Sequence, residues 1–378
     1  MDCACGKSGI RLQSTECIVR ITFLSTSVGP LGSGIGGGVE LTLRTLAAGL
    51  AARGHVITVL APRGSTLPNL PPTVELVQVD GALHVPSQTL DRGTKLQVPH
   101  DSVLVTMWKM ARDQAERGEC DVVLNFAYDV VPFVDAPLAV PTAHLVSMGS
   151  LSDEMDAAVT SALARKPNCV AMHTRAQAAT FGASVLQHAN IVLSGIDLAN
   201  YPFVATPGSD LAFVSRISRE KGIDDLFHVA SLSARRVQVF GIMEDEVAWR
   251  DAQARYPEAE VHHVGFLSTR ELAAQLGQCA ALVMVHRWVE AFGNVAIEAM
   301  ACGVPVVTYD RGGPAEIVSD GVTGYVVKAD DPGAVAAALT KIDAIDRATC
   351  RAAVVAQYSA SAFAERVERW LSAQATVG

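Results

Sequence analysis

Two successive series of apolar, β-rich runs alternating with helical stretches constrain the fold of this chain more than any other feature. The first series predicts a strand over 18–24, a glycine-rich turn over 29–38, a helix over 39–53 and a second strand over 56–60. This order forms a β-α-β unit. Weaker strands are predicted over 74–79, 122–126, 143–146 and 169–172, separated by helices such as 102–118. Strands joined through helices are parallel, so the sequence predicts an α/β fold with a doubly wound parallel sheet.

The second series follows a loop over 200–210 that is rich in proline and small residues and predicts a domain junction. Its strands are predicted over 211–214, 237–240, 261–264, 281–285 and 304–307. An amphipathic helix over 362–371 could close the second domain or return to the first. We therefore expect a disordered leader over 1–17, domains over 18–200 and 201–361, and a terminal helical segment over 362–378.

Composition excludes several classes of function. A length of 378 residues is enough for two cores, and 49% hydrophobic with 18% charged residues is typical of buried α/β domains. A net charge of −9 argues against nucleic acid or an anionic membrane as the main partner. The longest apolar stretch, 130–146, carries Asp135 and three prolines and falls short of the roughly 20 residues of a spanning helix. The polar N-terminus lacks a signal peptide, so a cytoplasmic location is expected.

The eight cysteines show no spacing typical of a disulfide framework. Cys169, Cys279 and Cys302 lie in apolar stretches and are expected to be buried. Cys3 and Cys5, with Cys17, lack the second pair or histidine of a metal site, so we predict no metal there.

Two carboxylates flank a predicted helix start in the segment Glu290-Ala-Phe-Gly-Asn-Val-Ala-Ile-Glu298. The unpaired N–H groups of a helix that begins near Gly293 suit a bound phosphate. One acid can then meet a sugar hydroxyl and the other a ribose diol. The alternative is that Glu290 is a helix-start acid favoured by the dipole and Glu298 a solvated helix residue.

Basic and glycine-rich turns follow the first strand of each series. Arg216 and Lys221 lie five positions apart and suit a pyrophosphate, although solvated charges are the alternative. The first turn contains G-x-G-x-x-G at Gly32, Gly34 and Gly37, which also predicts a dinucleotide site. The acid that should follow the second strand is missing, because that strand ends Leu-Ala-Pro-Arg63. A tight turn without a ligand is a further alternative.

These segments, with Glu-Ala-Met-Ala-Cys-Gly-Val-Pro-Val-Val over 298–307 and Gly-Gly-Pro-Ala-Glu-Ile-Val over 312–318, resemble the donor site of retaining glycosyltransferase family four. The resemblance covers almost the whole chain after Ile18. It implies the glycosyltransferase B fold, two Rossmann-like domains with the active site between them. It also implies transfer of a hexose from a nucleotide diphosphate sugar with retention, without a metal or other cofactor.

The resemblance also implies roles for individual residues. Catalytic roles fall on Glu290, which would fix the transferred sugar, on Arg216 and Lys221, which would neutralise the diphosphate, and on His144, which would face the sugar. Donor contacts fall on Gly37, Gly38, Leu267, Phe292, Gly293, Asn294, Val295 and Glu298. We place His144 at the end of a first-domain strand, and a satisfied core histidine is the equal alternative. His286 and Arg287 depart from the family's usual Pro-Ser.

The acceptor depends on first-domain loops that follow no general pattern. Segments 27–42, 125–129 and 144–152 resemble those of bacterial UDP-glucose:tetrahydrobiopterin glucosyltransferases, which implies UDP-glucose as donor and a reduced pterin as acceptor. Asn125, Tyr128 and Asp129 are candidate acceptor contacts, unless they form a buried polar cluster. A sugar, sugar phosphate or lipid acceptor stays open, as do UDP against GDP and the oligomeric state. An NAD(P)-dependent oxidoreductase, a non-catalytic sugar-nucleotide-binding protein and a nucleotide-sugar epimerase are the alternatives of other classes.

Overall fold

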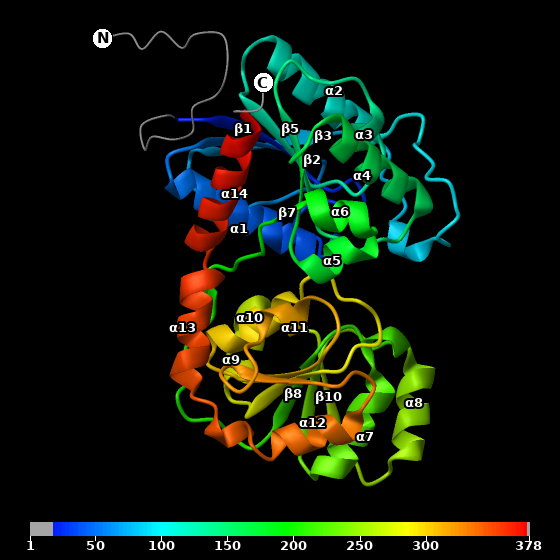
Figure 1. Cartoon of the computed structure of the whole chain (residues 1–378), viewed down its shortest axis with the longest axis vertical. Coiled ribbons are helices and arrows are strands. Elements are labelled where there is room, and N and C mark those ends of the chain that lie inside the picture. The colour runs from blue at the N-terminus through cyan, green and yellow to red at the C-terminus, as the bar shows by residue number, and fades with distance from the viewer. Residues whose placement is uncertain (1–17, 376–378) are drawn as a thin grey trace. The chain divides into compact units, whose positions relative to one another are not determined.

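The computed structural model describes residues 18–375 and divides the chain into two compact units (Figure 1). Of the described residues, unit 1 comprises 18–193 and 360–375, and unit 2 comprises 194–359. The leader expected over 1–17 lies outside the described residues, and so do 376–378 and the cysteines at positions 3, 5 and 17. The boundary falls at Ser194 and not near Asn200, because Ile196 N donates to Tyr358 O inside unit 2 (2.9 Å).

Unit 1 contains a seven-stranded, wholly parallel sheet in the order β3-β2-β1-β4-β5-β6-β7. Its strands are β1 (Arg20–Leu24), β2 (Val56–Pro62), β3 (Val74–Val79), β4 (Val122–Asn125), β5 (Thr142–Val146), β6 (Val170–Met172) and β7 (Asn190–Ile191). Its helices are α1 (Gly38–Ala52), α2 (Val103–Glu116), α3 (Val131–Val134), α4 (Asp153–Arg165), α5 (Arg175–Thr180), α6 (Ala183–His188) and α14 (Ala360–Ala375), with a short 3-10 helix at Ser87–Thr89.

Helices cover both faces of this sheet. One core joins strand residues such as Phe23 to Leu46 of α1 and Phe363 of α14, and a second core joins Leu24 to Met107 of α2. The C-terminal helix α14 therefore packs in unit 1, against α1. Gly49 makes this approach possible, because a Cβ there would lie 2.7 Å from the carbonyl oxygen of Ala360.

Unit 2 contains a six-stranded parallel sheet in the order β10-β9-β8-β11-β12-β13. Its strands are β8 (Leu211–Val214), β9 (Val237–Phe240), β10 (Val261–Gly265), β11 (Ala281–Met284), β12 (Val306–Tyr309) and β13 (Gly324–Val327). Its α-helices are α7 (Ile223–Ser233), α8 (Glu246–Arg255), α9 (Thr269–Gly277), α10 (Asn294–Ala301), α11 (Gly313–Ile317), α12 (Pro332–Leu339) and α13 (Arg347–Gln357), with 3-10 helices at Leu198–Asn200, Arg219–Lys221 and Ile342–Ala344.

Both sheets reverse their strand order once, which confirms the predicted doubly wound topology. The reversal lies between β1 and β4 in unit 1 and between β8 and β11 in unit 2. Ligands of such sheets bind outside the carboxyl ends of the strands at this switch point. The loops after these four strands are therefore where a site is expected.

The structure tests the expected burial of three cysteines and the expected absence of a membrane-spanning helix in the residues that it describes. Cys169, Cys279 and Cys302 are buried and unpaired by disulfides, as expected. Over 18–375, no helix has both the length and the apolar character needed to cross a bilayer. The cytoplasmic location stays a prediction.

Candidate functional site

The candidate site in unit 2 is built from loops at the carboxyl ends of its strands. The loop after β8 carries Arg216 and Lys221, and the loop after β11 carries Glu290 and leads into α10. These two strands flank the switch point of the sheet. Leu267 follows β10, farther along the same edge. The topology thus places the six residues 216–221 and the nine residues 290–298, which are far apart in sequence, on one edge of unit 2.

A close backbone approach brings the first two loops together. Gly222 has φ +80°, and a Cβ there would lie 1.9 Å from the carbonyl oxygen of Val285, directly after β11. The backbone N–H of Arg287 also donates to Glu220 O (2.8 Å). Only glycine fits this position, so Gly222 fixes the start of α7 against the end of β11. Lys221, its neighbour, is thereby aimed at the β11 loop.

Lys221 and Glu290 form an ion pair, with Lys221 Nζ 2.8 Å from Glu290 Oε2. Their side chains are only 13% and 22% exposed, so the pair is largely shielded from water. The indole N–H of Trp288 donates to the same oxygen (3.1 Å), and the Trp288 ring lies 4.4 Å from Lys221 Nζ. Burial alone would raise the pKa of Glu290, but Lys221 and the two hydrogen bonds keep it below its usual value. Glu290 is therefore ionised at neutral pH.

The loop after β12 supports Glu290 from the other side. Gly313 N donates to Glu290 O (2.8 Å). A Cβ on Gly312 would lie 2.7 Å from the backbone of Glu290, and one on Gly313 would lie 2.3 Å from Phe292 O. The Gly-Gly pair therefore allows this loop to pack directly on the Glu290 to Phe292 backbone. Gly293 is the N-cap of α10, whose first residues Asn294 and Val295 are partly exposed.

Two buried polar atoms beside this loop have no hydrogen-bond partner, His286 Nε2 and Asn294 Oδ1. Burial lowers the pKa of His286 to about 4, with Glu290 opposing the shift, so the imidazole is neutral at pH 7. Arg287 does not enter the site, because its guanidinium binds Asp225 (2.6 and 3.2 Å). Orphaned buried polar groups are uncommon in folded proteins, and a water or a ligand would satisfy these two.

Glu298 lies inside α10 and is buried, so the interpretation as a solvated helix residue is wrong. The hydroxyl of Tyr201 donates to Glu298 Oε1 (3.1 Å). Burial raises the pKa of Glu298 to about 7, although the Tyr201 hydrogen bond acts in the opposite direction. The two acids of the motif thus differ in charge state near neutrality: Glu290 is ionised and Glu298 titrates.

Arg216 takes a different set of partners from Lys221. Its Nη1 donates to Glu244 Oε2 (2.5 Å), and Nη2 lies 3.7 Å from Glu220 Oε1. The side chain is 47% exposed. The structure therefore places Arg216 on the predicted edge but does not bring it to Glu290.

The glycine-rich turn of unit 1 is organised by an acid of its own chain. Glu40, in the first turn of α1, accepts hydrogen bonds from the backbone N–H groups of Gly32 (2.6 Å), Gly34 (3.3 Å) and Gly36 (2.7 Å). Gly37 and Gly38 stay exposed at the start of α1. The strand β2 ends at Pro62, followed by Arg63, which pairs with Asp80. No acid ends β2, as the sequence indicated.

Comparison with known proteins identifies the family. Residues 205–347 match the family described as glycosyl transferases group 1. The glycogen synthase of Mycobacterium tuberculosis is 30% identical over 349 residues, which cover 81% of this chain and 82% of that protein. This chain belongs to the group 1 glycosyltransferases.

This glycosyltransferase is also similar to a second curated relative in sequence and to a solved structure in fold. The D-inositol 3-phosphate glycosyltransferase of Nocardiopsis dassonvillei is 27% identical over 392 residues, covering 89% of this chain and 88% of that protein. The crystal structure of Anabaena HepE in complex with UDP and glucose superposes with a TM-score of 0.71 at 18% identity, covering 94% and 100% of the two chains. Together with the two parallel sheets, this likeness shows the glycosyltransferase B fold.

His144 lies in the middle of β5 in the glycosyltransferase, which corrects its placement at a strand end. The ring is buried and stacked on Phe133 with centroids 4.0 Å apart, and Nδ1 lies 3.2 Å from Asn125 Nδ2. Burial lowers the pKa of His144 to about 3. This geometry is typical of the core alternative, because the ring is buried and already stacked on Phe133.

The candidate acceptor residues of the transferase follow β4 and have partners within unit 1. Asn125 bonds to the backbone of Ala127 (3.0 and 3.2 Å), and Asp129 Oδ2 lies 2.6 Å from His84 Nδ1. Tyr128 OH accepts from Leu151 N (3.1 Å), and burial raises the pKa of this phenol to about 12. These contacts match the alternative of a buried polar cluster.

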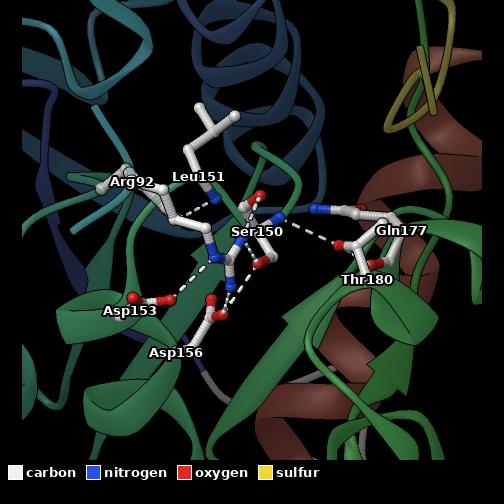
Figure 2. A network of polar contacts seen from close by, with 8 residues as sticks. Arg92, Ser150, Leu151, Asp153, Asp156, Gln177 and Thr180 are labelled. Carbon is white, nitrogen blue, oxygen red and sulfur yellow. Dashed lines mark hydrogen bonds and ion pairs between the residues drawn. The ribbon is translucent and has the colours of Figure 1, made fainter. Parts of the chain in front are cut away.

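A polar network next to this cluster attaches the segment before α2 to the start of α4 (Figure 2). The Arg92 guanidinium binds Asp153 (2.7 Å), Asp156 and Ser150 Oγ (2.8 Å). Ser150 N in turn donates to Thr180 Oγ1 (2.9 Å). Arg92 and the acidic first turn of α4 thus hold together loops of unit 1 whose conformation the sequence did not predict.

Sequence reasoning missed three polar groups of the transferase. Trp288 and Tyr201 contact the two glutamates of the motif. His173, directly after β6, lies 3.0 Å from Ser147, directly after β5, at the carboxyl edge of unit 1. The position of Trp288 two residues before Glu290 was a usable signal. Tyr201 and the Ser147–His173 pair had none, because their partners come from distant segments.

Proposed function

We propose that this glycosyltransferase moves a hexosyl group, with glucose of UDP-glucose as the first candidate, to a small acceptor with retention at the anomeric carbon. The observation that supports the proposal most is the ion pair of Lys221 with Glu290 at the switch point of unit 2. An ammonium, a carboxylate and a helix start on one edge are the groups that a nucleoside diphosphate sugar requires.

In this proposal, different residues bind the diphosphate, the sugar, the ribose and the base of the donor. Lys221, Arg216 and the N–H groups at the start of α10 receive the diphosphate. The resemblance adds Gly37 and Gly38 as donor contacts, although the N–H of Gly37 already donates to Gly34 O (3.1 Å). Glu290 accepts from hydroxyls of the transferred sugar, and Glu298 from the ribose diol. The loop at Leu267 meets the nucleobase. Arg216 must exchange its partner Glu244 for phosphate oxygens, which costs little because that ion pair is exposed.

The chemistry is charge stabilisation at the leaving group. The bond between the anomeric carbon and the diphosphate oxygen breaks, and negative charge develops on the diphosphate, where Lys221 and the helix start stabilise it. The acceptor hydroxyl attacks the same face of the sugar and transfers its proton to the departing phosphate. The products are the α-glycoside and the protonated nucleoside diphosphate, so no metal or cofactor enters the balance.

Tetrahydrobiopterin is the acceptor that we propose to test first, on the resemblance of segments 27–42, 125–129 and 144–152. A sugar or sugar phosphate is the second candidate, since the Nocardiopsis relative is named for D-inositol 3-phosphate. Asn125, Tyr128 and Asp129 would then act by shaping the acceptor loops, because their polar groups already have partners within unit 1.

One experiment separates these possibilities. The protein is incubated with UDP- and GDP-sugars and, in separate reactions, tetrahydrobiopterin, inositol phosphate and simple sugars, and the products are analysed by mass spectrometry. A pterin hexoside with an α-linkage by NMR is the expected result. A hexoside of another acceptor overturns the pterin assignment, and nucleotide binding without any transfer supports a non-catalytic binding protein. Reduction or oxidation of a nicotinamide cofactor would contradict the whole proposal.

A further inference from the structure

Trp288 contacts both members of the Lys221–Glu290 pair. Its indole N–H donates to Glu290 Oε2 (3.1 Å), the oxygen that also receives Lys221 Nζ (2.8 Å). Its ring lies 4.4 Å from the same Nζ. The indole thus offers a donor to the anion and a π face to the cation. Both interactions favour the charged forms of the pair.

We infer that Trp288 is a positioning residue for donor binding, which orients the Glu290 carboxylate through its indole N–H and the Lys221 ammonium through its ring. The inference rests on the proposed donor site. Trp288 is not assigned a role by the two-glutamate motif, and it lies in the same segment as His286 and Arg287, where the sequence departs from the family pattern.

The hydrogen bonds of Glu290 show what this orientation achieves. Lys221 and Trp288 both bond to Oε2, whereas Oε1 receives no hydrogen bond from the part of the chain that the structure describes. With Oε2 occupied by two donors, the carboxylate can rotate only by breaking both bonds. Oε1 is therefore the oxygen presented to a sugar hydroxyl. A carboxylate fixed in this way loses less conformational entropy when the sugar binds.

The surroundings of the pair explain why an additional contact matters. The carboxylate and ammonium are mostly shielded from water, and the neutral, buried His286 lies close enough to interact with Glu290. In such a region each hydrogen bond to a charged group contributes more than it would at the surface. The ring of Trp288 favours the Lys221 position beside Glu290.

Two variants at one position separate the two contacts. Trp288→Phe keeps a ring near Lys221 but removes the N–H, and Trp288→Leu removes both. Trp249→Phe is the matched control, because Trp249 also belongs to unit 2 but packs on Phe227 and His263. All three variants are compared with wild type for UDP affinity, for kcat and KM of the donor sugar, and for thermal unfolding.

The expected results differ between the contacts. Trp288→Phe lowers kcat about tenfold, the equivalent of one hydrogen bond to a charged group, and leaves UDP affinity within twofold. Trp288→Leu in addition weakens UDP binding by about five- to tenfold through loss of the cation–π contact. The acidic limb of kcat/KM moves to higher pH in Trp288→Phe, since one of the groups that keep the pKa of Glu290 low is gone, while Lys221 and His286 still face the carboxylate.

A ligand-free measurement distinguishes failure of this inference from failure of the proposed function. The emission of Trp288, taken as wild type minus Trp288→Phe, is recorded in Lys221→Met and Glu290→Gln backgrounds, and both substitutions are expected to change it. If wild type binds no nucleotide but both substitutions change the emission, the donor site is wrong and the contacts are right. If both Trp288 variants keep wild-type kcat, UDP affinity and pH limb, or lose activity only in proportion to unfolding, Trp288 is a packing residue and the inference is overturned.

Discussion

The carboxyl edges of the two sheets carry similar residues in very different states. In unit 1, Glu40 is bonded to the backbone of the glycine-rich turn, and Asp129 is bonded to His84. In unit 2, Glu290 is bonded to Lys221 and Trp288, and the buried atoms His286 Nε2 and Asn294 Oδ1 have no partner. Glu40 and Asp129 thus hold loops of unit 1 in place, whereas the Glu290 carboxylate is shared by a lysine and a tryptophan beside the segment proposed to bind the donor. Unpartnered buried atoms occur in both units, since Asp156 Oδ1 of unit 1 has no hydrogen bond among the described residues either. The difference therefore lies in the partners of the acids and not in the number of orphaned atoms.

The largest effect is expected when the charge pair of unit 2 is broken. Lys221→Met leaves the Glu290 carboxylate shielded from water without its cation, which should destabilise unit 2 by about 3 kcal/mol. UDP affinity should fall about 100-fold with the loss of the ammonium. Adding Glu290→Gln should restore much of the stability and none of the affinity. Chemical unfolding and UDP titration measure the two quantities, with Lys341→Met, an exposed lysine of unit 2, as control. Equal affinity in Lys221→Met and wild type would place the diphosphate elsewhere.

A second test concerns the titrating acid of unit 2. The pKa of Glu298 is raised from 4.5 to about 7 in the folded protein, so the fold favours the protonated form. The stability that this contributes is complete below about pH 4.5 and is lost as pH rises to 7; above 7, the ionised acid costs up to about 3 kcal/mol. Glu298→Gln should therefore be more stable than wild type at pH 8 and similar to it at pH 4.5. Thermal unfolding across this range measures the difference.

Donor binding supplies the control for Glu298. A ribose diol that donates to the ionised carboxylate would make UDP affinity rise with pH through 7 in wild type and stay flat in Glu298→Gln. A stability difference that does not change with pH would show that Glu298 is not the titrating group.

A smaller effect is expected for His144 of unit 1. His144→Leu removes the ring stacked on Phe133 and the contact with Asn125, which should cost about 2 kcal/mol of unfolding free energy. The kcat of the folded variant should stay within about threefold of wild type, because the buried ring contacts Phe133 and Asn125 of its own unit. Activity assays corrected for the folded fraction check this. A hundredfold loss of kcat at full folding would restore the catalytic interpretation and weaken the contrast between the two edges.

The smallest effect is expected at Glu40. Glu40→Ala frees three backbone N–H groups of the glycine-rich turn, which should cost about 1 kcal/mol and speed proteolytic cleavage over 29–37. Glu40→Gln keeps one acceptor oxygen, so its stability and its rate of cleavage should lie between those of wild type and Glu40→Ala. Mass spectrometry of the fragments locates the cut. Tighter binding of UDP by Glu40→Gln would instead show that the carboxylate competes with a phosphate for this turn.

The periodicity of apolar residues in the sequence predicted most of the strands and helices of the fold. The strands at Val74–Val79, Leu211–Val214 and Val237–Phe240 have the predicted bounds, because apolar β-branched runs between polar turns are a local signal. Asn190–Ile191 and Gly324–Val327 were not predicted as strands, because the first is two residues long and the second begins with a glycine. The unit boundary also differed, since residues 194–200 join unit 2 through a bond to Tyr358, far away in sequence.

The site followed from the sequence where its geometry is local. The spacing of Glu290, Gly293 and Glu298 placed one acid before α10 and one inside it, and the structure agrees. Which partners these acids take was not predictable. Lys221 is 69 positions from Glu290, and Tyr201 is 97 positions from Glu298.

The amino-acid sequence by itself determined the two parallel sheets and the sheet edge on which the two-glutamate motif lies. It also supplied glycine at positions 222, 312 and 313, where the loops pack directly on neighbouring backbone. These depend on local preferences and on short spacings. The tertiary structure alone decided that Glu290 is ionised, that Glu298 titrates near neutrality and that the His144 ring is buried against Phe133. Charge state depends on burial and on through-space partners, which exist only after distant segments have packed.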